Sequence, residues 1–295
     1  MKTRKLLDYR KLAFNFHFAA FFVLSIVTLI PLAYTFRLSL FDYQLSKPGS
    51  LNIFIGLKNY KVLFTDPGFY KSLGITLIYV ISSVSLEMVV GIILSLILHQ
   101  IPFLRRMFSS MILVPMLIAP LVIGLIFSFF TNPQFGLYTH LVTKFKLPLP
   151  IVLLDKPVKA LVTLIIMDVW QWAPYMTLIF LAGLQSIEGE YFEAADIDGC
   201  NGWQKFWKIT MPLLKPIISV SVLLRAMEAL KEFDKPYIYS GGGPGNATEV
   251  IDLYTYRQAF SSFKFSYASA LCVVLFVLLL ILGRIYQKFM MNKDL

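Results

Sequence analysis

Apolar residues fall into six stretches along the chain, and each stretch is long enough to cross a membrane as a helix. About 20 apolar residues in helical form span the roughly 30 Å hydrocarbon core of a bilayer. The stretches are spread over the whole chain and are separated by polar segments. They run near residues 14–36, 73–98, 107–130, 159–182, 213–233 and 265–282. The pattern therefore predicts an all-α, polytopic membrane protein with six transmembrane helices.

The basic residues predict how the chain is oriented in the membrane. Five of the first 11 residues are Lys or Arg, but the apolar stretch that follows is too long for a signal peptide and no A-x-A cleavage site closes it. We expect a retained first span with residues 1–13 in the cytoplasm, since short cytoplasmic segments carry an excess of Lys and Arg. Six spans then place the C-terminus in the cytoplasm as well. The inner segments are 1–13, 99–106, 183–212 and 283–295, and residues 14–295 form one transmembrane domain.

The segments expected on the outer side are polar loops. Those near 37–72 and 131–158 are rich in Pro, Asn, Asp and Gly, and a third covers 234–264. The third loop contains the string Gly241 to Asn246, which we expect not to be helical, because Gly costs about 1 kcal/mol and Pro about 3 kcal/mol in a helix. A phosphate-binding loop would need a strand before this string and Lys-Ser or Lys-Thr after it, and neither is present.

Composition excludes several classes of protein. The residues are 57% hydrophobic and 15% charged, with a mean hydropathy of +0.70. A soluble domain has about 25% charged residues, so a soluble globule and a disordered chain are both excluded. The net charge is +10, but the basic residues cluster at the ends of apolar stretches, so we expect no nucleic-acid partner. Three scattered histidines and two cysteines predict neither a metal site nor a disulfide framework.

The inner segment 183–212 has an unusual order of residue types. Its acidic residues come first and predict a helix over about 190–198, with the acids toward the N-terminal end. Gly199 stands where a helix ends with a positive φ. The aromatic residues of a second short helix share one face, at i, i+3 and i+4: Trp203, Phe206 and Trp207. From these residues alone, the aromatic face packs on the chain's own span ends, lies at the lipid headgroups, or docks to another protein.

A set of residues in this segment resembles a known signature. Glu193-Ala194-Ala195, Gly199, Ile209, Met211 and Pro212 match E-A-A-x3-G-x9-I-x-L-P, with Met211 in place of Leu. The signature is typical of the permease subunits of binding-protein-dependent ABC importers. The resemblance implies the type I ABC importer permease architecture, in which this loop is a coupling helix inserted into a cleft of the ATPase subunit. The ATPase-coupling residues that it implies are Glu193, Ala194, Ala195, Asp198, Gly199, Trp203, Phe206, Ile209 and Pro212.

A second segment narrows the resemblance to carbohydrate permeases. Residues 225–234, followed by 240–245, are similar to R-x-x-D-A-L-K-x-F-D and T-G-G-G-P-G of maltose-, trehalose- and polyol-type permeases. Glu228 stands in place of Asp, and Ser240 in place of Thr. The resemblance covers about residues 70–290 and implies a sugar, of di- or oligosaccharide size, as the substrate.

The fifth span carries ionisable residues that cannot face lipid. Each such group at the centre of the bilayer costs about 2.5–3.5 kcal/mol, so Arg225, Glu228 and Glu232 must face protein or water. They share one helical face, on which Arg225 and Glu228 can pair with each other. The fourth span has a matching face with an acid, an amide and two aromatic rings. This combination suits the hydroxyl groups and the C–H faces of a sugar.

The resemblance implies that both faces border the substrate pathway, since the matching segments of maltose-type relatives line a mid-membrane cavity. The predicted substrate-pathway residues are Asp168, Gln171, Trp172, Tyr175, Arg225, Glu228, Ala229 and Glu232. The alternative is an ion-pair network that fixes the fourth span to the fifth or to a partner subunit. Glu87, in the second span, is expected to bond a neighbouring helix, with substrate contact as its alternative role.

The leading hypothesis is a permease subunit of an ATP-driven ABC importer, which is a transport subunit and not an enzyme. The chain contains no G-x-x-x-x-G-K-[ST] loop, so we expect it to bind no cofactor itself, with ATP and Mg bound by a partner ATPase. The resemblance implies four kinds of partner: a second, homologous permease subunit, an ATP-binding subunit dimer on the cytoplasmic side, an extracytoplasmic sugar-binding protein, and membrane lipid. The expected location is the plasma or inner membrane of a prokaryote.

Three alternatives stay open at this point. A polyol, glycerol phosphate or an acidic sugar fits the same mechanism, because Arg225 does not decide the charge of the substrate. A stand-alone secondary transporter would fit the intramembrane charges, but six spans without an inverted repeat give one chain little to move against. An intramembrane enzyme is disfavoured, because the chain contains neither H-E-x-x-H nor G-x-S-x-G.

Overall fold

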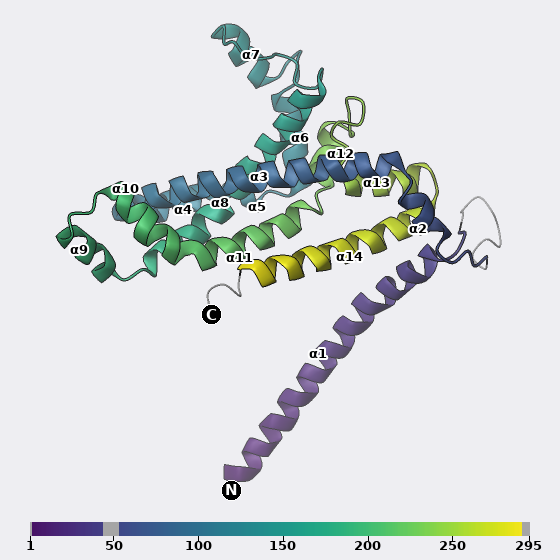
Figure 1. Cartoon of the computed structure of the whole chain (residues 1–295), viewed down its shortest axis with the longest axis horizontal. Helices are drawn as coiled ribbons and strands as arrows, with labels where there is room; N and C mark the ends of the chain where they lie inside the picture. The colour runs from purple at the N-terminus through teal and green to yellow at the C-terminus, as the bar shows by residue number, and fades with distance from the viewer. Residues whose placement is uncertain (1, 44–52, 291–295) are drawn as a thin grey trace. The chain divides into compact units, whose positions relative to one another are not determined.

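The computed structural model of the chain describes residues 2–43 and 53–290, and these residues form helices joined by turns and short loops (Figure 1). An isolated bridge pairs Phe41 with Phe54, and the described residues contain no longer strand. The predicted all-α class is therefore confirmed. Residues 44–52 of the first predicted outer loop and 291–295 of the predicted inner tail lie outside the described residues. The chain divides into two compact units, one of residues 1–66 and 255–278, the other of residues 67–254 and 279–295.

The first unit begins with the long helix α1. Its elements are α1 (Lys2–Ser39), α2 (Lys58–Leu63), a π-helical turn (Arg257–Ser261) and the beginning of α14 (Phe265–Met290). Hydrogen bonds join the end of α1 to α2: the hydroxyl oxygens of Ser39 and Tyr60 are 2.6 Å apart, and Asn59 Nδ2 donates to the Ser39 carbonyl at 2.8 Å. Most described side chains of the apolar part of α1 (Ala20–Ser39) are exposed within this chain. This helix therefore needs lipid or another helix to cover it.

The second unit is built around α3 (Pro67–Gln100) and α8 (Pro157–Gln185), which lie side by side (Figure 1). A Cβ on Gly91 of α3 would lie 2.6 Å from the Cβ of Met176, so only glycine lets the two helices approach this closely. α11 (Met211–Ala229) packs against both helices, and Gly183 of α8 makes room there for Leu214. The buried apolar core contains Tyr79, Val80, Val84, Leu164, Met167, Met176 and Phe180.

The third predicted span is not one continuous helix. The expected stretch 107–130 is divided into α4 (Pro102–Ile112), α5 (Val114–Leu117) and α6 (Pro120–Phe130). Pro120 has no N–H and disfavours helical geometry in the residue before it, Ala119, which has φ −59° and ψ 139°. The chain is already extended at Ile118 (φ −83°, ψ 133°). Five described helices are long and apolar enough to span a membrane, and α6 is a shorter apolar helix. The other five predicted stretches each fall within helices of the structure, apart from their ends.

The fifth predicted span ends earlier than expected. α11 ends at Ala229, because the backbone N–H groups of Lys231 and Glu232 bond three residues back, at 3.0 and 3.3 Å, and tighten the last turn. Glu232 therefore does not continue the helical face of Arg225, which corrects the expected spacing. After this turn comes α12 (Asp234–Tyr239), which packs against α6.

The glycine-rich string after α12 is not helical, as predicted. Gly241, Gly242 and Gly245 have φ of +53°, +81° and +56°, values that side chains disfavour. Lys71 Nζ of α3 donates to the Gly245 carbonyl at 2.9 Å, and this hydrogen bond holds the loop against α3. The chain then forms α13 (Ile251–Tyr256), whose first backbone N–H donates to Thr76 Oγ1 at 2.8 Å.

Candidate functional site

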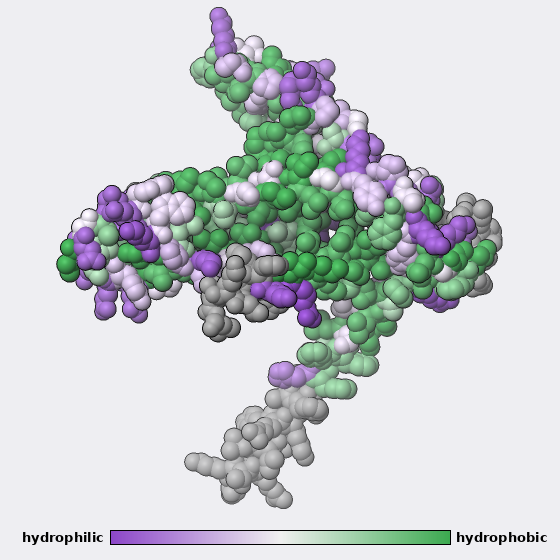
Figure 2. Space-filling model, viewed as in Figure 1, coloured by the Kyte–Doolittle hydropathy of each residue, from purple (hydrophilic) through white to green (hydrophobic). Residues whose placement is uncertain are grey.

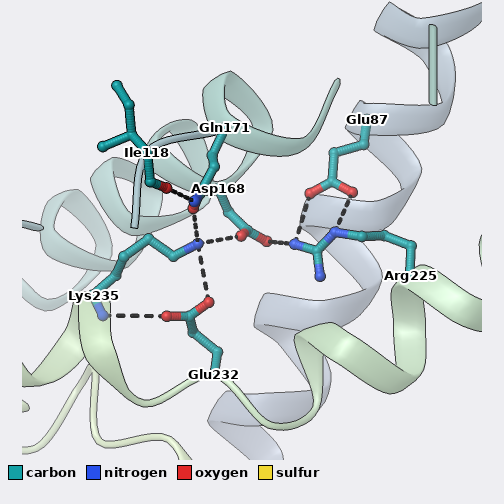
Figure 3. Close-up of polar contacts among 7 residues, drawn as sticks. All are labelled: Glu87, Ile118, Asp168, Gln171, Arg225, Glu232 and Lys235. Carbon is teal, nitrogen blue, oxygen red and sulfur yellow. Dashed lines mark hydrogen bonds and ion pairs between the residues drawn. The ribbon is translucent and has the colours of Figure 1, made fainter. Parts of the chain in front are cut away.

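A buried arginine of α11 joins the two central helices of the second unit. Arg225 Nη2 lies 2.5 Å from Asp168 Oδ2 of α8 and 3.1 Å from Glu87 Oε1 of α3 (Figure 3). Arg225 Nε also lies 2.9 Å from Glu87 Oε2, an ion pair without a well-directed hydrogen bond. The structure thus confirms that Glu87 bonds a neighbouring helix. Three helices far apart in sequence meet at one guanidinium group.

A second buried cation extends this network. Lys235 Nζ of α12 lies 2.6 Å from Asp168 Oδ1 and 2.9 Å from Glu232 Oε2, and it donates to Gln171 Oε1 at 2.9 Å. Gln171 Nε2 donates in turn to the Ile118 carbonyl at 3.0 Å, at the break between α5 and α6 (Figure 3). The network therefore connects α3, α8, α11 and α12 with the divided third stretch.

Burial makes these pairings decisive for the fold. The side chains of Glu87, Asp168 and Lys235 are 0% exposed, that of Arg225 is 2% exposed, and that of Glu232 is 9% exposed. Charges at such depth are tolerated only when they are paired and hydrogen-bonded, and removing one partner of a buried pair costs about 3–5 kcal/mol. The network holds three carboxylates and two cations, so the loss of a cation leaves a larger imbalance than the loss of a carboxylate.

Arg225 does not pair with Glu228, although their spacing allows it. Glu228 instead pairs with Lys231 at 2.8 Å, and both side chains are more than half exposed. One turn of helix separates Arg225 from Glu228, but Arg225 points into the contact with α3 and α8, whereas Glu228 does not. The packing of distant helices therefore overrides the local i, i+3 option.

A small cavity lies beside the network. It has a volume of about 220 Å³, and its lining residues are Pro120, Trp172, Arg225, Glu228, Lys231, Glu232, Phe233 and Asp234. The Arg225 guanidinium lies 5.0 Å from the centroid of the Trp172 ring, a cation–π contact. Phe233 stacks on Tyr237, with ring centroids 5.1 Å apart. Two aromatic side chains and several charged ones thus border the same space.

The structure separates the predicted substrate-pathway residues into two groups. Trp172, Arg225, Glu228 and Glu232 line the cavity, and Tyr175 is half-buried with its ring edge-on to Trp172, 6.2 Å between centroids. The others are fully buried and do not line the cavity: Asp168, Gln171 and Ala229.

Sequence reasoning missed the residues of α12 and of the turn before it. Phe233 is the last residue of the predicted fifth span, and Asp234 and Lys235 begin the predicted outer loop 234–264. The usable signal was Lys235 three residues after Glu232, since oppositely charged residues at this spacing can pair. Asp252 of α13 lies near Glu232, and burial together with that charge raises the pKa of Asp252 to about 6.

The inner loop has the predicted helix-turn-helix form. α9 (Gly189–Ile197) ends before Gly199, whose φ is +72°, and α10 (Gly202–Lys205) continues into a π-helical turn (Phe206–Thr210) and then α11. Asn201 and Gln204 form a capping box at the start of α10, and an ion pair joins Asp196 of α9 to Lys205 of α10. Hydrophilic side chains gather over this end of the second unit (Figure 2). The ion pair therefore joins α9 to α10, and the capping box stabilises the start of α10.

The aromatic residues of this loop form a cluster that the chain does not cover. The ring centroids of Trp203 and Phe206 are 6.1 Å apart and those of Phe206 and Trp207 are 5.0 Å apart, yet Trp203 is 70% exposed. Packing on the chain's own span ends thus does not bury this face within the described residues. Of the other predicted coupling residues, Glu193, Ala194, Asp198, Gly199 and Pro212 are exposed, Ile209 is half-buried, and Ala195 is buried.

Comparison with known proteins assigns the chain to a family. The family described as "Binding-protein-dependent transport system inner membrane component" matches residues 87–291. Over 269 residues the chain is 36% identical to the probable ABC transporter permease protein y4oQ of Sinorhizobium fredii, covering 90% of this chain and 86% of that protein. Over 269 residues it is also 33% identical to the trehalose/maltose transport system permease protein MalF of Thermococcus litoralis, covering 90% and 89% of the two chains.

A solved structure has the same fold. The crystal structure of a bacterial ABC transporter involved in the import of the acidic polysaccharide alginate is similar with a TM-score of 0.80 and 20% identity, covering 98% of this chain and 99% of that one. The fold is that of an ABC transporter permease. The chain belongs to the family of inner-membrane components of binding-protein-dependent transport systems, and it is therefore a multi-pass membrane protein. The resemblance seen in the sequence is confirmed.

Proposed function

We propose that this chain is the permease subunit of an ATP-driven importer for a di- or oligosaccharide that an extracytoplasmic binding protein delivers. The observation that carries the proposal is the course of α11. This helix follows directly from the inner loop at Met211 and ends at Ala229, beside the cavity that Trp172 and Phe233 line. One helix can thus transmit a movement of the loop to the cavity. Relatives named for trehalose/maltose transport support a sugar as the substrate.

The inner loop is proposed to dock to an ATPase subunit. The exposed Trp203 and its ring contacts with Phe206 and Trp207 offer an apolar surface, which is costly to leave in water. The Asp196–Lys205 ion pair and the Asn201 cap stabilise the loop. A movement of the ATPase subunit is therefore passed on to α11 instead of unfolding the loop. ATP and Mg are then bound by the partner ATPase dimer, this chain binds no cofactor, and it has no enzymatic activity of its own.

A second, homologous permease subunit is proposed to complete the pathway. The uncovered apolar side chains of α1 support a neighbour in the membrane, either lipid or the partner subunit. The cavity of about 220 Å³ is smaller than the roughly 300–1,000 Å³ of sites that enclose a drug-sized ligand, so a sugar of two or more units needs additional walls. Both termini of the chain lie on the cytoplasmic side in this arrangement.

The test is the loss of coupling in the inner loop. The double change Gly199→Asp with Glu193→Lys places a side chain at a φ of +72° and reverses an exposed charge. We expect ATP-driven sugar uptake to be lost and ATP hydrolysis to be uncoupled, with the chain still inserted in the membrane. Gly189→Ala is the matched control, because Gly189 lies in the same loop, has space for a Cβ and has no positive φ. Unchanged uptake in the double variant would contradict the proposed coupling role.

Purification from the native membrane in mild detergent separates the proposal from its main rival. A second permease of similar size and a soluble ATPase in comparable amounts are the expected companions of the tagged chain. A chain that comes out alone and stable would instead favour a stand-alone secondary transporter.

A further inference from the structure

We infer that the cavity beside Trp172 accepts one unit of a neutral sugar and disfavours an anionic one, with the carboxylate of Asp234 accepting sugar hydroxyl groups. This inference rests on the proposed function and narrows it to a class of substrate. The similar proteins do not decide between a neutral and an anionic substrate, because one relative is named for trehalose/maltose transport and a similar solved structure is of a transporter that imports an acidic polysaccharide.

The buried arginine is not available to bind an anion. Arg225 is already paired with the carboxylates of Glu87 and Asp168, and its guanidinium lies 5.0 Å from the Trp172 ring. Only 2% of its side chain is exposed. A substrate carboxylate would have to displace a buried protein carboxylate, which would then lack its partner. Arg225 therefore borders the cavity without providing a free positive charge.

The second cation at the cavity is also paired. Lys231 Nζ lies 2.8 Å from Glu228 Oε1, and Glu232 is paired with Lys235 behind the cavity wall. Asp234 is the carboxylate that remains, since it forms no ion pair with any residue in the described parts of the chain. It is half-buried at the first position of α12.

The charge balance of the cavity is therefore negative. Its lining residues carry three carboxylates, on Glu228, Glu232 and Asp234, against two cations, on Arg225 and Lys231. A like charge placed in such a partly enclosed site is repelled, whereas an uncharged sugar hydroxyl can donate to the free carboxylate. The aromatic rings of Trp172 and Phe233 supply apolar contact area for the C–H faces of a sugar. The volume of about 220 Å³ limits this contact to a single sugar unit of a longer substrate.

The experiment compares two probes that differ in one charge. Methyl glucoside and methyl glucuronide are titrated into the purified transporter, which contains this chain, its partner permease and the ATPase, without the binding protein. Saturation-transfer NMR detects such weak binding directly. We expect the Kd of the glucuronide to be at least roughly tenfold higher than that of the glucoside, as like-charge repulsion at a partly buried site predicts.

Two variants tie this preference to the cavity. Asp234→Asn keeps the size and the helix-starting character of the side chain but removes its charge, so the ratio of the two Kd values is expected to shrink. Lys231→Gln changes an exposed side chain and leaves Glu228 without its partner, so the ratio is expected to grow. Asp155→Asn is the control, because Asp155 lies outside the cavity, before the first residue of α8, and pairs with Lys159 of that helix. It is expected to leave the ratio unchanged.

Each contrary result overturns the inference. The first such result is that the glucuronide binds as tightly as the glucoside or more tightly, and the second is that neither probe binds. The third is that the ratio of the two Kd values is the same in Asp234→Asn as in Asp155→Asn. ATP-driven uptake by proteoliposomes from the same preparation, with the binding protein added, tests the proposed function separately. If they take up sugars without regard to charge, only the inference fails. If they take up no sugar at all, the proposed function fails.

Discussion

Replacing Arg225 tests whether the buried network determines the stability of the second unit. Arg225→Gln removes one of two cations and leaves the carboxylates of Glu87, Asp168 and Glu232 with Lys235 alone. Breaking a buried pair in this way costs about 3–5 kcal/mol. Net stabilities of folded proteins are about 5–15 kcal/mol, so the expected loss is a large share of the total.

Glu87→Gln is expected to be milder, because it leaves two carboxylates with two cations. The expected cost is about 1.5–3 kcal/mol, the value of a hydrogen bond to a charged group. The double variant should then be more stable than Arg225→Gln alone, since the change at Glu87 removes a carboxylate that has lost its partner. Coupling energies of neighbouring residues are about 0.5–3 kcal/mol, and the rescue should fall in this range.

The assay is reversible unfolding of the purified chain in mixed detergent and SDS, followed by far-UV circular dichroism. Lys231→Gln is the control, because it breaks an exposed ion pair worth about 0–1 kcal/mol. If the free-energy losses of the two single variants simply add in the double variant, Arg225 and Glu87 are not coupled and the reasoning about charge balance is refuted.

Two further predictions concern helix packing and pH. Gly91→Val should cost about 1–3 kcal/mol of stability in the same assay, because a Cβ alone would already lie 2.6 Å from Met176. Gly74→Val is the control and should cost much less, because Gly74 lies on the same helix with open space around it. Equal losses in the two variants would contradict the close contact of α3 and α8. The pKa of Asp252 is raised to about 6, from an ordinary value of about 4, so the folded state binds the extra proton and stability should fall as the pH rises from about 4 to 6. Asp252→Asn should flatten this dependence and stabilise the protein at pH 7, and an unchanged pH profile would refute the assignment.

Local chemistry made the inner loop and most of the membrane helices predictable. Gly199 marks the end of α9 with a positive φ, and the i, i+3 and i+4 spacing brings Trp203, Phe206 and Trp207 into one cluster. Both features depend on residues within a few positions of each other. The break in the third stretch had a local cause as well, because Pro120 was visible within the apolar run, but hydropathy alone does not register it.

Tertiary structure alone decided which charges meet. Arg225 pairs with Asp168 and Glu87, which lie 57 and 138 residues away, while Glu228 at i+3 pairs elsewhere. The sequence shows that buried charges must find partners, because an unpaired charge in an apolar interior is too costly. It does not show which partners, because that choice depends on how closely α3 and α8 approach at Gly91 and on where α12 returns with Lys235. Hydropathy and backbone sterics act along the chain, whereas ion pairing depends on distances in space, and those exist only once the helices have packed.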